Sequence, residues 1–362
     1  MVTLFGRSWT REELLCHAGN ISQLGGVRLA TLDDGRGRGI RTVQLETGSG
    51  LAFSVLLDRG MDIGSTRYKG AALAWESNVG PAHPMYFEKD GLSWHRTWSG
   101  GLMNGCGMTF MGTPCEDQGE QLGIHGRLSH LPASNVWADA AWRDDRYEMW
   151  VQGKVREAVA KGDTVELNRR VWAFLGESRI FVRDVVTNEG VDPAPHMMLY
   201  HFNFGFPLLA EGTELIAPSR SIKSHVFHQG DPAQDHARYA APIKGFVEQG
   251  ATHEDIVVQE DGFATLVLAN RRFDDGRGLG LYYRYRPAEL PNFVQWIMVR
   301  AGVYVTAFEP SNCPMMGGRA KARKDGTLPF LQSGEAREYN FEVGVLANNE
   351  EIDAMASKVA AS

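Results

Sequence analysis

Short apolar runs separated by glycine-rich turns make up most of the chain. These runs are rich in Val, Phe, Tyr and Trp, and several alternate apolar with polar residues, which is typical of β-strands. Turn signals such as Asp261-Gly262 and Asp325-Gly326 separate them. The pattern predicts strands at 42–45, 51–57, 179–186, 264–268, 293–299 and 303–308.

Helical patterns occur only at the two ends of the chain, at 11–17 and 350–359. Because helices do not alternate with the strands, the pattern indicates an antiparallel sandwich or barrel rather than a parallel α/β fold. We find no linker and no internal repeat, so residues 1–362 are predicted to form a single domain. The polar stretch 229–241 and the basic run 319–324 are both interpreted as solvent-exposed loops.

Composition and charge narrow the class of protein. Hydrophobic residues make up 43% of the 362 residues, which is enough for a large core. The formal net charge of −7, without a strong basic patch, argues against nucleic acid as a partner. No apolar stretch reaches the length of a membrane span, and Leu14-Leu15-Cys16 leads at once into polar residues rather than a signal-peptide core. The spacing of the four cysteines fits no disulfide framework or zinc ribbon, so we expect a cytoplasmic protein with reduced thiols.

Two segments carry histidines that are candidates for chemistry. In Gly123-Ile124-His125-Gly126-Arg127, a histidine precedes glycine where backbone can approach a ligand closely. In the segment from Tyr200 to Pro207, His201 and Asn203 interrupt an aromatic strand. Aromatic faces with a few hydrogen-bonding groups suit sugars, which combine apolar C–H faces with hydroxyl rims. The alternatives are a structural histidine in the first segment and a polar pair in the core in the second.

A third segment, from Val303 to Asn312, ends an apolar strand with a carboxylate, Glu309, and Pro310 is predicted to end the strand. Partial desolvation at such a position raises the pKa of a carboxyl group toward the range of a general base. The alternative is a glutamate paired with an arginine. His125, His201 and Glu309 would form a metal site only if they converged, and we expect neither a metal nor a cofactor. The chain has no phosphate-binding loop ending in Lys-Ser/Thr and no Gly-x-Ser-x-Gly elbow.

Taken together, the three segments resemble the aldose 1-epimerase (galactose mutarotase-like) superfamily. The order is that of the family: a His-Gly segment, a His-bearing aromatic strand, and a Glu-Pro pair near the C-terminus. Ser99-Gly100-Gly101-Leu102 ahead of His125 is similar to a Gly-Gly pair found in several branches. The resemblance spans roughly residues 40–347 and is nearest to a poorly characterised branch that bears the segment Asp58-Arg59-Gly60-Met61-Asp62-Ile63.

The resemblance implies a large antiparallel β-sandwich that binds a small-molecule sugar in a cleft and uses acid–base chemistry without a cofactor. By this analogy, Glu309 takes the proton of the anomeric hydroxyl and His201 protonates the ring oxygen. The ring then opens, the C1–C2 bond rotates, and closure produces the other anomer. His125 would bind a hydroxyl group near the ring oxygen.

The chain departs from the family pattern at three points. Ser99 and Ser129 stand where the phosphosugar-binding branch has arginines, so a hexose 6-phosphate is not the expected substrate. Arg127 and Arg59 could restore an anion site if either side chain reached the cleft. No aspartate can be assigned the role of holding substrate hydroxyls, as one does in galactose-type enzymes. The sugar therefore stays open.

Further candidate substrate contacts rest on weaker patterns. Trp296 lies in the strand before that of Glu309 and could stack on a sugar face, or could belong to the core. Arg59 and Asp62 could contact substrate, or could form a structural ion pair at a turn. Asn104 lies in glycine-rich sequence ahead of His125 and could donate to a hydroxyl group.

Three functions remain open. The leading hypothesis is a mutarotase-like isomerase that interconverts sugar anomers. The second is an isomerase or lyase that abstracts a proton beside a sugar carbonyl, for which a divalent metal could assist the same Glu/His pair. The third is a carbohydrate-binding protein without catalytic activity.

Overall fold

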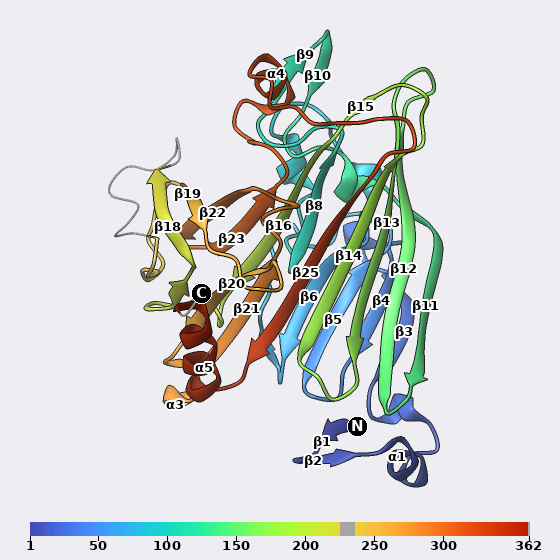
Figure 1. The fold of residues 1–362 in the computed structure, drawn as a ribbon, viewed down its shortest axis with the longest axis vertical. Coiled ribbons are helices and arrows are strands. Elements are labelled where there is room, and N and C mark those ends of the chain that lie inside the picture. Colours follow the sequence, from blue (N-terminus) through green and yellow to red (C-terminus); the bar gives the residue numbers. More distant parts are fainter. Residues whose placement is uncertain (225–235, 361–362) are drawn as a thin grey trace.

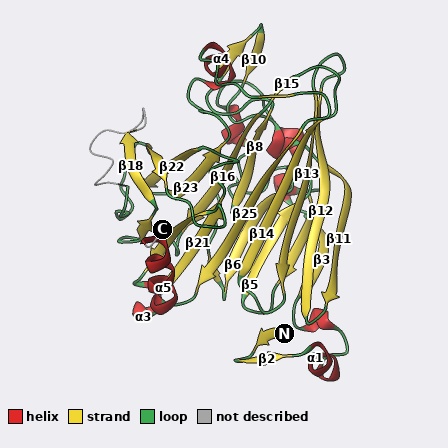
Figure 2. Cartoon of the chain, in the orientation of Figure 1, coloured by secondary structure: helices red, strands yellow, loops and turns green. Residues whose placement is uncertain are grey.

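The computed structural model describes residues 1–224 and 236–360, which form strands with a few short helices (Figures 1 and 2). The strands are β1 (Val2–Leu4), β2 (Arg7–Trp9), β3 (Gly26–Thr31), β4 (Arg41–Glu46), β5 (Leu51–Leu56), β6 (Asp62–Tyr68), β7 (Ala71–Ala72), β8 (Met103–Met108), β9 (Cys115–Asp117), β10 (Glu120–Leu122), β11 (Ala133–Arg143), β12 (Arg146–Ala158), β13 (Thr164–Phe174), β14 (Arg179–Asn188), β15 (Ala194–Pro195), β16 (Met197–Gly205), β17 (Glu214–Ile216), β18 (Ser219–Ser224), β19 (Gln249–Ile256), β20 (Ala264–Asn270), β21 (Leu279–Tyr285), β22 (Asn292–Arg300), β23 (Val303–Ser311), β24 (Phe330–Leu331) and β25 (Ala336–Leu346). The α-helices are α1 (Arg11–His17), α3 (Phe273–Gly276), α4 (Gly318–Lys324) and α5 (Asn349–Ala360). Single 3₁₀ turns are η1 (Ile21–Gln23), η2 (Gly35–Gly37), η3 (Pro84–Tyr86), η4 (Ser93–Arg96) and η5 (Leu128–His130).

Two large antiparallel sheets make up the body of the fold. In the part of the chain that the structure describes, one sheet has eight strands in the order β11-β12-β13-β14-β25-β21-β20-β17. The other has eleven, in the order β18-β19-β22-β23-β16-β8-β6-β5-β4-β3, with β7 paired to β6. Figure 1 shows β25, β14, β13 and β12 lying over β6, β5 and β4, so the sheets stack face to face. The fold is a large antiparallel β-sandwich, as the sequence pattern and the resemblance together predicted.

The main hydrophobic core lies between the two sheets. Phe202 of β16 packs against Tyr283 of β21 and Phe341 of β25, with ring centroids 4.7 and 5.4 Å apart. Phe308 of β23 belongs to the same cluster. Because successive strand residues point to opposite faces, the neighbours of these aromatic residues point away from the core, to the outer face of the eleven-stranded sheet.

A second, smaller apolar cluster covers part of that outer face. It includes Trp94, Trp98, Cys106, Leu199 and Cys313. Every residue of β8 and of β16 is consequently buried, one face by the main core and the other by this cluster and the loops that carry it. The second cluster explains why β16 reads as a continuous apolar strand around two polar residues.

The structure confirms the six predicted strands and both terminal helices. The strands correspond to β4, β5, β14, β20, β22 and β23, and the helices to α1 and α5. Among the described residues, no helix is both long and apolar enough to cross a membrane. That the whole chain forms one domain stays a prediction.

Three details of the sequence interpretation are corrected. Strand β23 does not end at Pro310 but continues to Ser311. Its pairing with β16 skips the positions between Phe308 and Ser311, so the strand needs no N–H donor at Pro310. The basic run 319–324 lies in helix α4, which Arg319 and Arg323 hold through ion pairs to Asp117.

The third correction concerns the predicted exposed loop at 229–241. Residues 229–235 lie outside the described residues. Tyr239 is buried rather than exposed, and its hydroxyl lies 2.7 Å from both Thr306 Oγ1 and the donating Gln295 Nε2. A tyrosine in a polar stretch can thus anchor the segment to the sheet.

Candidate active site

A cavity of about 220 Å³ lies on the outer face of the eleven-stranded sheet, beside the second apolar cluster. Four sequence-predicted residues line it: His125, His201, Trp296 and Glu309. Its wall also includes Trp98, His95 and Glu248, which sequence reasoning did not select. The cavity therefore gathers residues from η4, the His-Gly loop, β16, β22, β23 and the segment that leads into β19.

His201 and Glu309 face each other on adjacent antiparallel strands. Leu199 pairs with Ser311 and Phe202 with Phe308, and this register places residue 201 opposite residue 309. His201 Nε2 lies 3.5 Å from Glu309 Oε1, and the two side chains are only 5% and 3% exposed. Since Phe202 and Phe308 enter the main core, the alternation of strand residues turns both polar side chains toward the cavity.

Burial changes the protonation of this pair. Desolvation, followed by the nearby charge of Glu248, raises the pKa of Glu309 to about 8. Desolvation lowers the pKa of His201 to about 3, against a smaller opposite effect of the Asn203 side chain. The neutral forms of both groups are therefore favoured near neutral pH, and the pair holds one transferable proton, located on Glu309.

The His-Gly segment lies against the end of β8. His125 has φ 62° and Gly126 φ 77°, both in the left-handed region. A Cβ atom on Gly126 would lie 2.5 Å from the carbonyl oxygens of Gly107 and Phe110, so a side chain at position 126 does not fit. The His125 amide donates to Gly112 O at 3.0 Å, and Gly107 N donates to His125 O at 3.1 Å. The close backbone approach predicted for this motif is thus made to the protein's own chain.

The loop holds the His125 ring beside His201, with ring centroids 5.7 Å apart. Burial, and then the charge of His201, lowers the pKa of His125 well below its ordinary value, which favours a neutral imidazole. His125 Nδ1 is buried and, among the described residues, has no hydrogen-bonding partner. Most buried polar atoms in folded proteins have a partner, so this unpaired atom beside the cavity makes His125 a candidate ligand contact.

Two tryptophans form the aromatic part of the cavity wall. The Trp98 and Trp296 rings lie 5.1 and 5.8 Å from the His201 ring, and 5.8 Å from each other. Trp296 Nε1 donates to Glu248 Oε2 at 2.9 Å, which orients that carboxylate at the cavity. The cavity thus combines apolar ring surfaces with an acid–base pair and a second carboxylate.

The other four predicted contact residues do not line the cavity. Arg127 makes ion pairs with Glu157 at 3.1 Å and with Glu120 at 3.2 Å, so its charge is already matched. Arg59 is completely buried and donates to Ala82 O at 2.6 Å. Neither arginine is placed to restore an anion site at the cavity.

Asp62 and Asn104 are completely buried as well. The expected ion pair between Asp62 and Arg59 is not formed, because the cation nearest to Asp62 is Arg169 of β13, at 3.8 Å. Asp62 accepts hydrogen bonds from Gly105 N, Ser129 Oγ and Asn104 Nδ2. Both residues belong to a polar network beneath the cavity wall, which a pattern of charged residues in sequence cannot distinguish from a surface site.

The residues that the sequence analysis missed differ in whether a sequence signal could have indicated them. Trp98 and His95 belong to the cluster Trp94-His95-x-x-Trp98, whose density of aromatic and imidazole groups was a usable signal. Glu248 follows Phe246-Val247 in a segment without a recognisable motif. Its role became visible only because the strand pairing of β19 with β22 brings it to Trp296.

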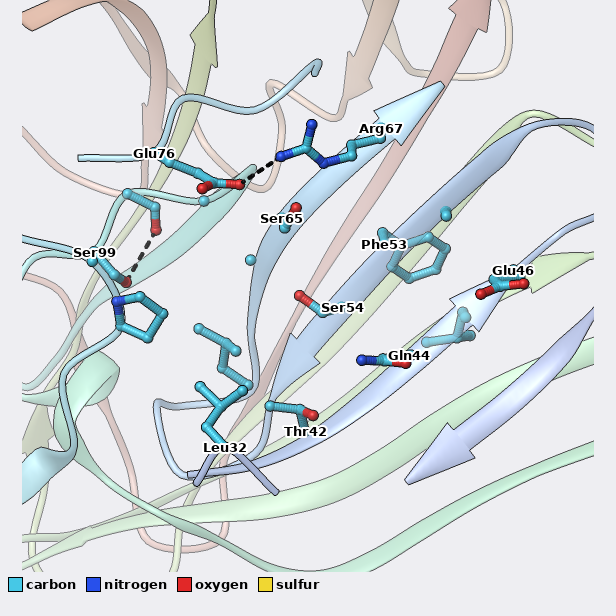
Figure 3. A pocket seen from close by; sticks show the side chains of 18 residues that line it. Leu32, Thr42, Gln44, Glu46, Phe53, Ser54, Ser65, Arg67, Glu76 and Ser99 are labelled. Carbon is cyan, nitrogen blue, oxygen red and sulfur yellow. Dashed lines mark hydrogen bonds and ion pairs between the residues drawn. The ribbon is translucent and has the colours of Figure 1, made fainter. Parts of the chain in front are cut away.

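A larger groove, of about 440 Å³, lies elsewhere on the outer face of the same sheet. Figure 3 shows Gln44, Ser54 and Ser65 on neighbouring strands, with an ion pair between Arg67 and Glu76 at 3.6 Å. Its lining contains no histidine, and the ion pair in it joins Glu76 to an arginine, which stays protonated and cannot exchange a proton with substrate. Volume alone would select this groove, but the chemistry selects the smaller cavity.

The possibility of a metal site formed by His125, His201 and Glu309 has a mixed outcome. The three side chains do border one cavity. Within residues 1–224 and 236–360, however, no group of three or more His, Cys, Asp or Glu side chains is arranged to hold a metal ion. The pair chemistry of Glu309 and His201 is the arrangement that the geometry supports.

Comparison with known proteins bears on the fold. A search of the curated proteins found no match. Among solved structures, a Klebsiella pneumoniae protein described as a candidate aldose 1-epimerase superposes with a TM-score of 0.86 at 24% identity, covering 94% of this chain and 90% of its own. A galactose mutarotase-like protein from Clostridium acetobutylicum superposes at 0.60 with 12% identity, covering 90% and 99% of the two chains. A galactose 1-epimerase from Lactobacillus acidophilus superposes at 0.53 with 10% identity and covers the same shares.

These likenesses establish the fold, and the resemblance seen in the sequence is confirmed at that level. A family model described as a domain of unknown function, DUF4432, matches residues 37–345. The chain therefore belongs to the DUF4432 family, and its fold is that of the galactose mutarotase-like proteins.

Proposed function

We propose that this protein interconverts the anomers of a monosaccharide by acid–base catalysis. The observation that carries the proposal is the opposed pair of His201 and Glu309, 3.5 Å apart in a cavity walled by tryptophans. The reaction needs two groups that exchange protons with the anomeric hydroxyl and the ring oxygen. Both oxygens are bonded to C1, so the two groups must lie side by side.

The steps follow from the one proton that the pair holds. Ring opening starts from the form with the proton on His201: the Glu309 carboxylate takes the proton of the anomeric hydroxyl, the bond between C1 and the ring oxygen breaks, and His201 protonates the ring oxygen. This leaves Glu309 protonated and His201 neutral, which is the form that burial favours. After rotation about C1–C2, the same transfers in reverse close the ring on the other face. Acid–base chemistry of this kind requires no cofactor.

The remaining cavity residues suit the substrate proposed. Trp296 offers an apolar face for sugar C–H groups, and His125, which lines the cavity and whose Nδ1 is unpaired within the described part of the chain, is a candidate to bind a hydroxyl group. Glu248 supplies a carboxylate that can accept hydroxyl hydrogen bonds, the role for which the sequence analysis found no residue. A volume of about 220 Å³ is below the roughly 300–1,000 Å³ of drug-sized ligand pockets, which favours a monosaccharide.

The test is anomer exchange of D-glucose and D-galactose, measured by polarimetry on freshly dissolved sugar and by NMR exchange spectroscopy. We expect the purified full-length chain to accelerate exchange of at least one aldose and Glu309→Gln to abolish most of that acceleration. The matched control is Glu289→Gln, which removes a half-buried carboxylate bonded to Asn340, outside the cavity.

The same experiment separates the alternatives. Binding of a sugar without exchange in wild-type protein would favour a carbohydrate-binding protein. Exchange of the hydrogen at C2 with solvent deuterium, rather than of the anomers, would indicate proton abstraction beside a carbonyl. Equal activity of Glu309→Gln and wild type would refute the assignment of Glu309.

A further inference from the structure

Asn104, in β8, occupies a buried position next to the catalytic pair. The register of β8 with β16 places it directly opposite His201. Its side-chain amide makes four hydrogen bonds, so its full capacity is used. Nδ2 donates to Asp62 Oδ2 at 2.9 Å and to Gly100 O at 3.2 Å, while Oδ1 accepts from Trp98 Nε1 at 2.8 Å and from Asn203 Nδ2 at 3.0 Å.

The partners allow only one orientation of this amide. An indole N–H can only donate, so the oxygen must face Trp98. A backbone carbonyl can only accept, so the nitrogen must face Gly100 O, and Asp62 Oδ2 lies on that side. No other side chain of similar size offers an acceptor on one side and two donors on the other. Asn104 thus connects the buried Asp62 to the indole of Trp98.

Trp98 is the residue through which Asn104 can reach the site. It is 7% exposed and lines the cavity, packed against His201 and Trp296. The bond to Asn104 engages the only side-chain polar atom of Trp98. Removing its acceptor would leave a buried donor unpaired and free the ring to tilt.

We propose that Trp98 forms, beside Trp296, part of the aromatic surface on which the substrate ring packs, and that Asn104 is a positioning residue that acts on substrate binding through Trp98. This inference rests on the proposed function for the identity of the ligand as a sugar. Asn104 itself does not touch substrate, because it is completely buried and absent from the cavity wall. Asp62, with Ser129 and Gly105 N as further partners, anchors the amide from behind.

Two substitutions at position 104 separate positioning from a general structural role. Asn104→Leu removes the acceptor and the donors at similar size. Asn104→Asp keeps an oxygen facing the indole but loses both donors and sets a second carboxyl group against Asp62. If Asn104 has only a structural role, both substitutions should weaken sugar binding. If Asn104 acts through Trp98, the Asn104→Asp variant should retain sugar binding.

The assay is the dissociation constant of D-galactose and D-glucose, measured by ligand-observed NMR, so it does not depend on turnover. We expect Asn104→Leu to weaken binding about tenfold, the effect of one unpaired buried hydrogen-bonding group, and Asn104→Asp to weaken it less than about threefold. The Trp98 indole resonance, identified as the signal missing from ¹⁵N spectra of Trp98→Phe, should move in the leucine variant and stay near its position in the aspartate variant.

A double-mutant cycle with Trp98→Phe completes the test, because phenylalanine keeps an aromatic ring but has no N–H. In that background, Asn104→Leu should cause less than a twofold further loss of binding. Equal losses for the leucine and aspartate variants, or the same tenfold loss with Phe at position 98, would overturn the proposal. If Asn104→Leu does not fold, the comparison of Asn104→Asp with Trp98→Phe decides: weaker binding by the aspartate variant refutes it.

The outcome is distinct from that of the proposed function. The expected binding pattern without anomer exchange would support the role of Asn104 and remove the mutarotase assignment. Anomer exchange with a different binding pattern would do the reverse. Failure of wild-type protein to bind either sugar would overturn both.

Discussion

Glu309→Gln should make the protein more stable and nearly inactive at the same time. The substitution keeps the size and most of the hydrogen-bonding capacity of the side chain but removes the ionisable proton. Burial raises the pKa of Glu309 from its ordinary value of 4.5 to about 8. The charged carboxylate is therefore costly in the folded protein, and glutamine avoids that cost.

The magnitude follows from linkage between protonation and folding. The folded protein holds the Glu309 proton up to about pH 8, whereas the unfolded chain releases it near pH 4.5. Stability from this group is thus fully present below pH 4.5 and is lost as pH rises toward 8. At about 1.4 kcal/mol for each pH unit, the loss approaches about 5 kcal/mol, an upper estimate because the site can relax. Glutamine does not titrate, so the advantage of the variant should grow over the same interval.

Activity should change in the opposite direction. Loss of a general acid–base group typically lowers turnover by about 10²–10⁴-fold. In wild-type protein, kcat/KM should also fall as pH rises through about 8, because the pair then loses the one proton it shares.

Melting temperatures of both proteins near pH 5 and near pH 8.5, with polarimetric rates corrected for spontaneous mutarotation, measure both effects. Glu289→Gln is the control for removing a carboxylate elsewhere. A variant with no stability advantage at the higher pH would show that Glu309 is not held in its neutral form. Near-normal turnover would show that Glu309 is not the base.

The remaining predictions concern the neighbours of Glu309. His201→Asn should lower turnover by about 10²–10⁴-fold, while His125→Asn should chiefly raise KM, and reversed effects would mean that the two roles are exchanged. Glucose 6-phosphate should bind more weakly than glucose in calorimetric titrations, because the cavity wall contains Glu248 and Glu309 but no lysine or arginine, and tighter binding of the phosphate would contradict this. Gly126→Ala should lower the free energy of unfolding by about 1–3 kcal/mol, because the alanine Cβ would lie 2.5 Å from two carbonyl oxygens. Urea denaturation measures this, and an unchanged midpoint would mean that the loop moves aside.

The sequence was informative wherever the alternation of residues along a strand determines which way a side chain points. Strand residues alternate between faces, so aromatic neighbours directed into a core imply that His201 and Glu309 point outward together. A glycine after His125 likewise indicated a close backbone approach, but the approach is to Gly107 and Phe110 of the protein itself rather than to a ligand. The strand pattern predicted a sandwich or a barrel, and the family resemblance of the three segments added the choice of the sandwich and the candidate acid–base pair.

Long-range pairing was not predictable from the same patterns. The register of β16 with β23 sets the distance between His201 and Glu309, and nothing in either strand alone encodes it. Glu248 has no motif and reaches the cavity because β19 pairs with β22. Cross-strand register depends on turns and packing far along the chain, which local propensity does not specify.

Burial determined which of the other predicted contact residues can meet a ligand. Asn104, Asp62 and Arg59 look like binding residues in sequence, because polar side chains in glycine-rich segments are typical of ligand contacts. In the folded protein all three are completely buried and bonded to protein groups. The sequence alone determined which residue types and which strand faces are available. Whether a polar side chain meets a ligand or another part of the protein depends on what the second sheet and the covering loops place against it. Only the tertiary structure contains that information.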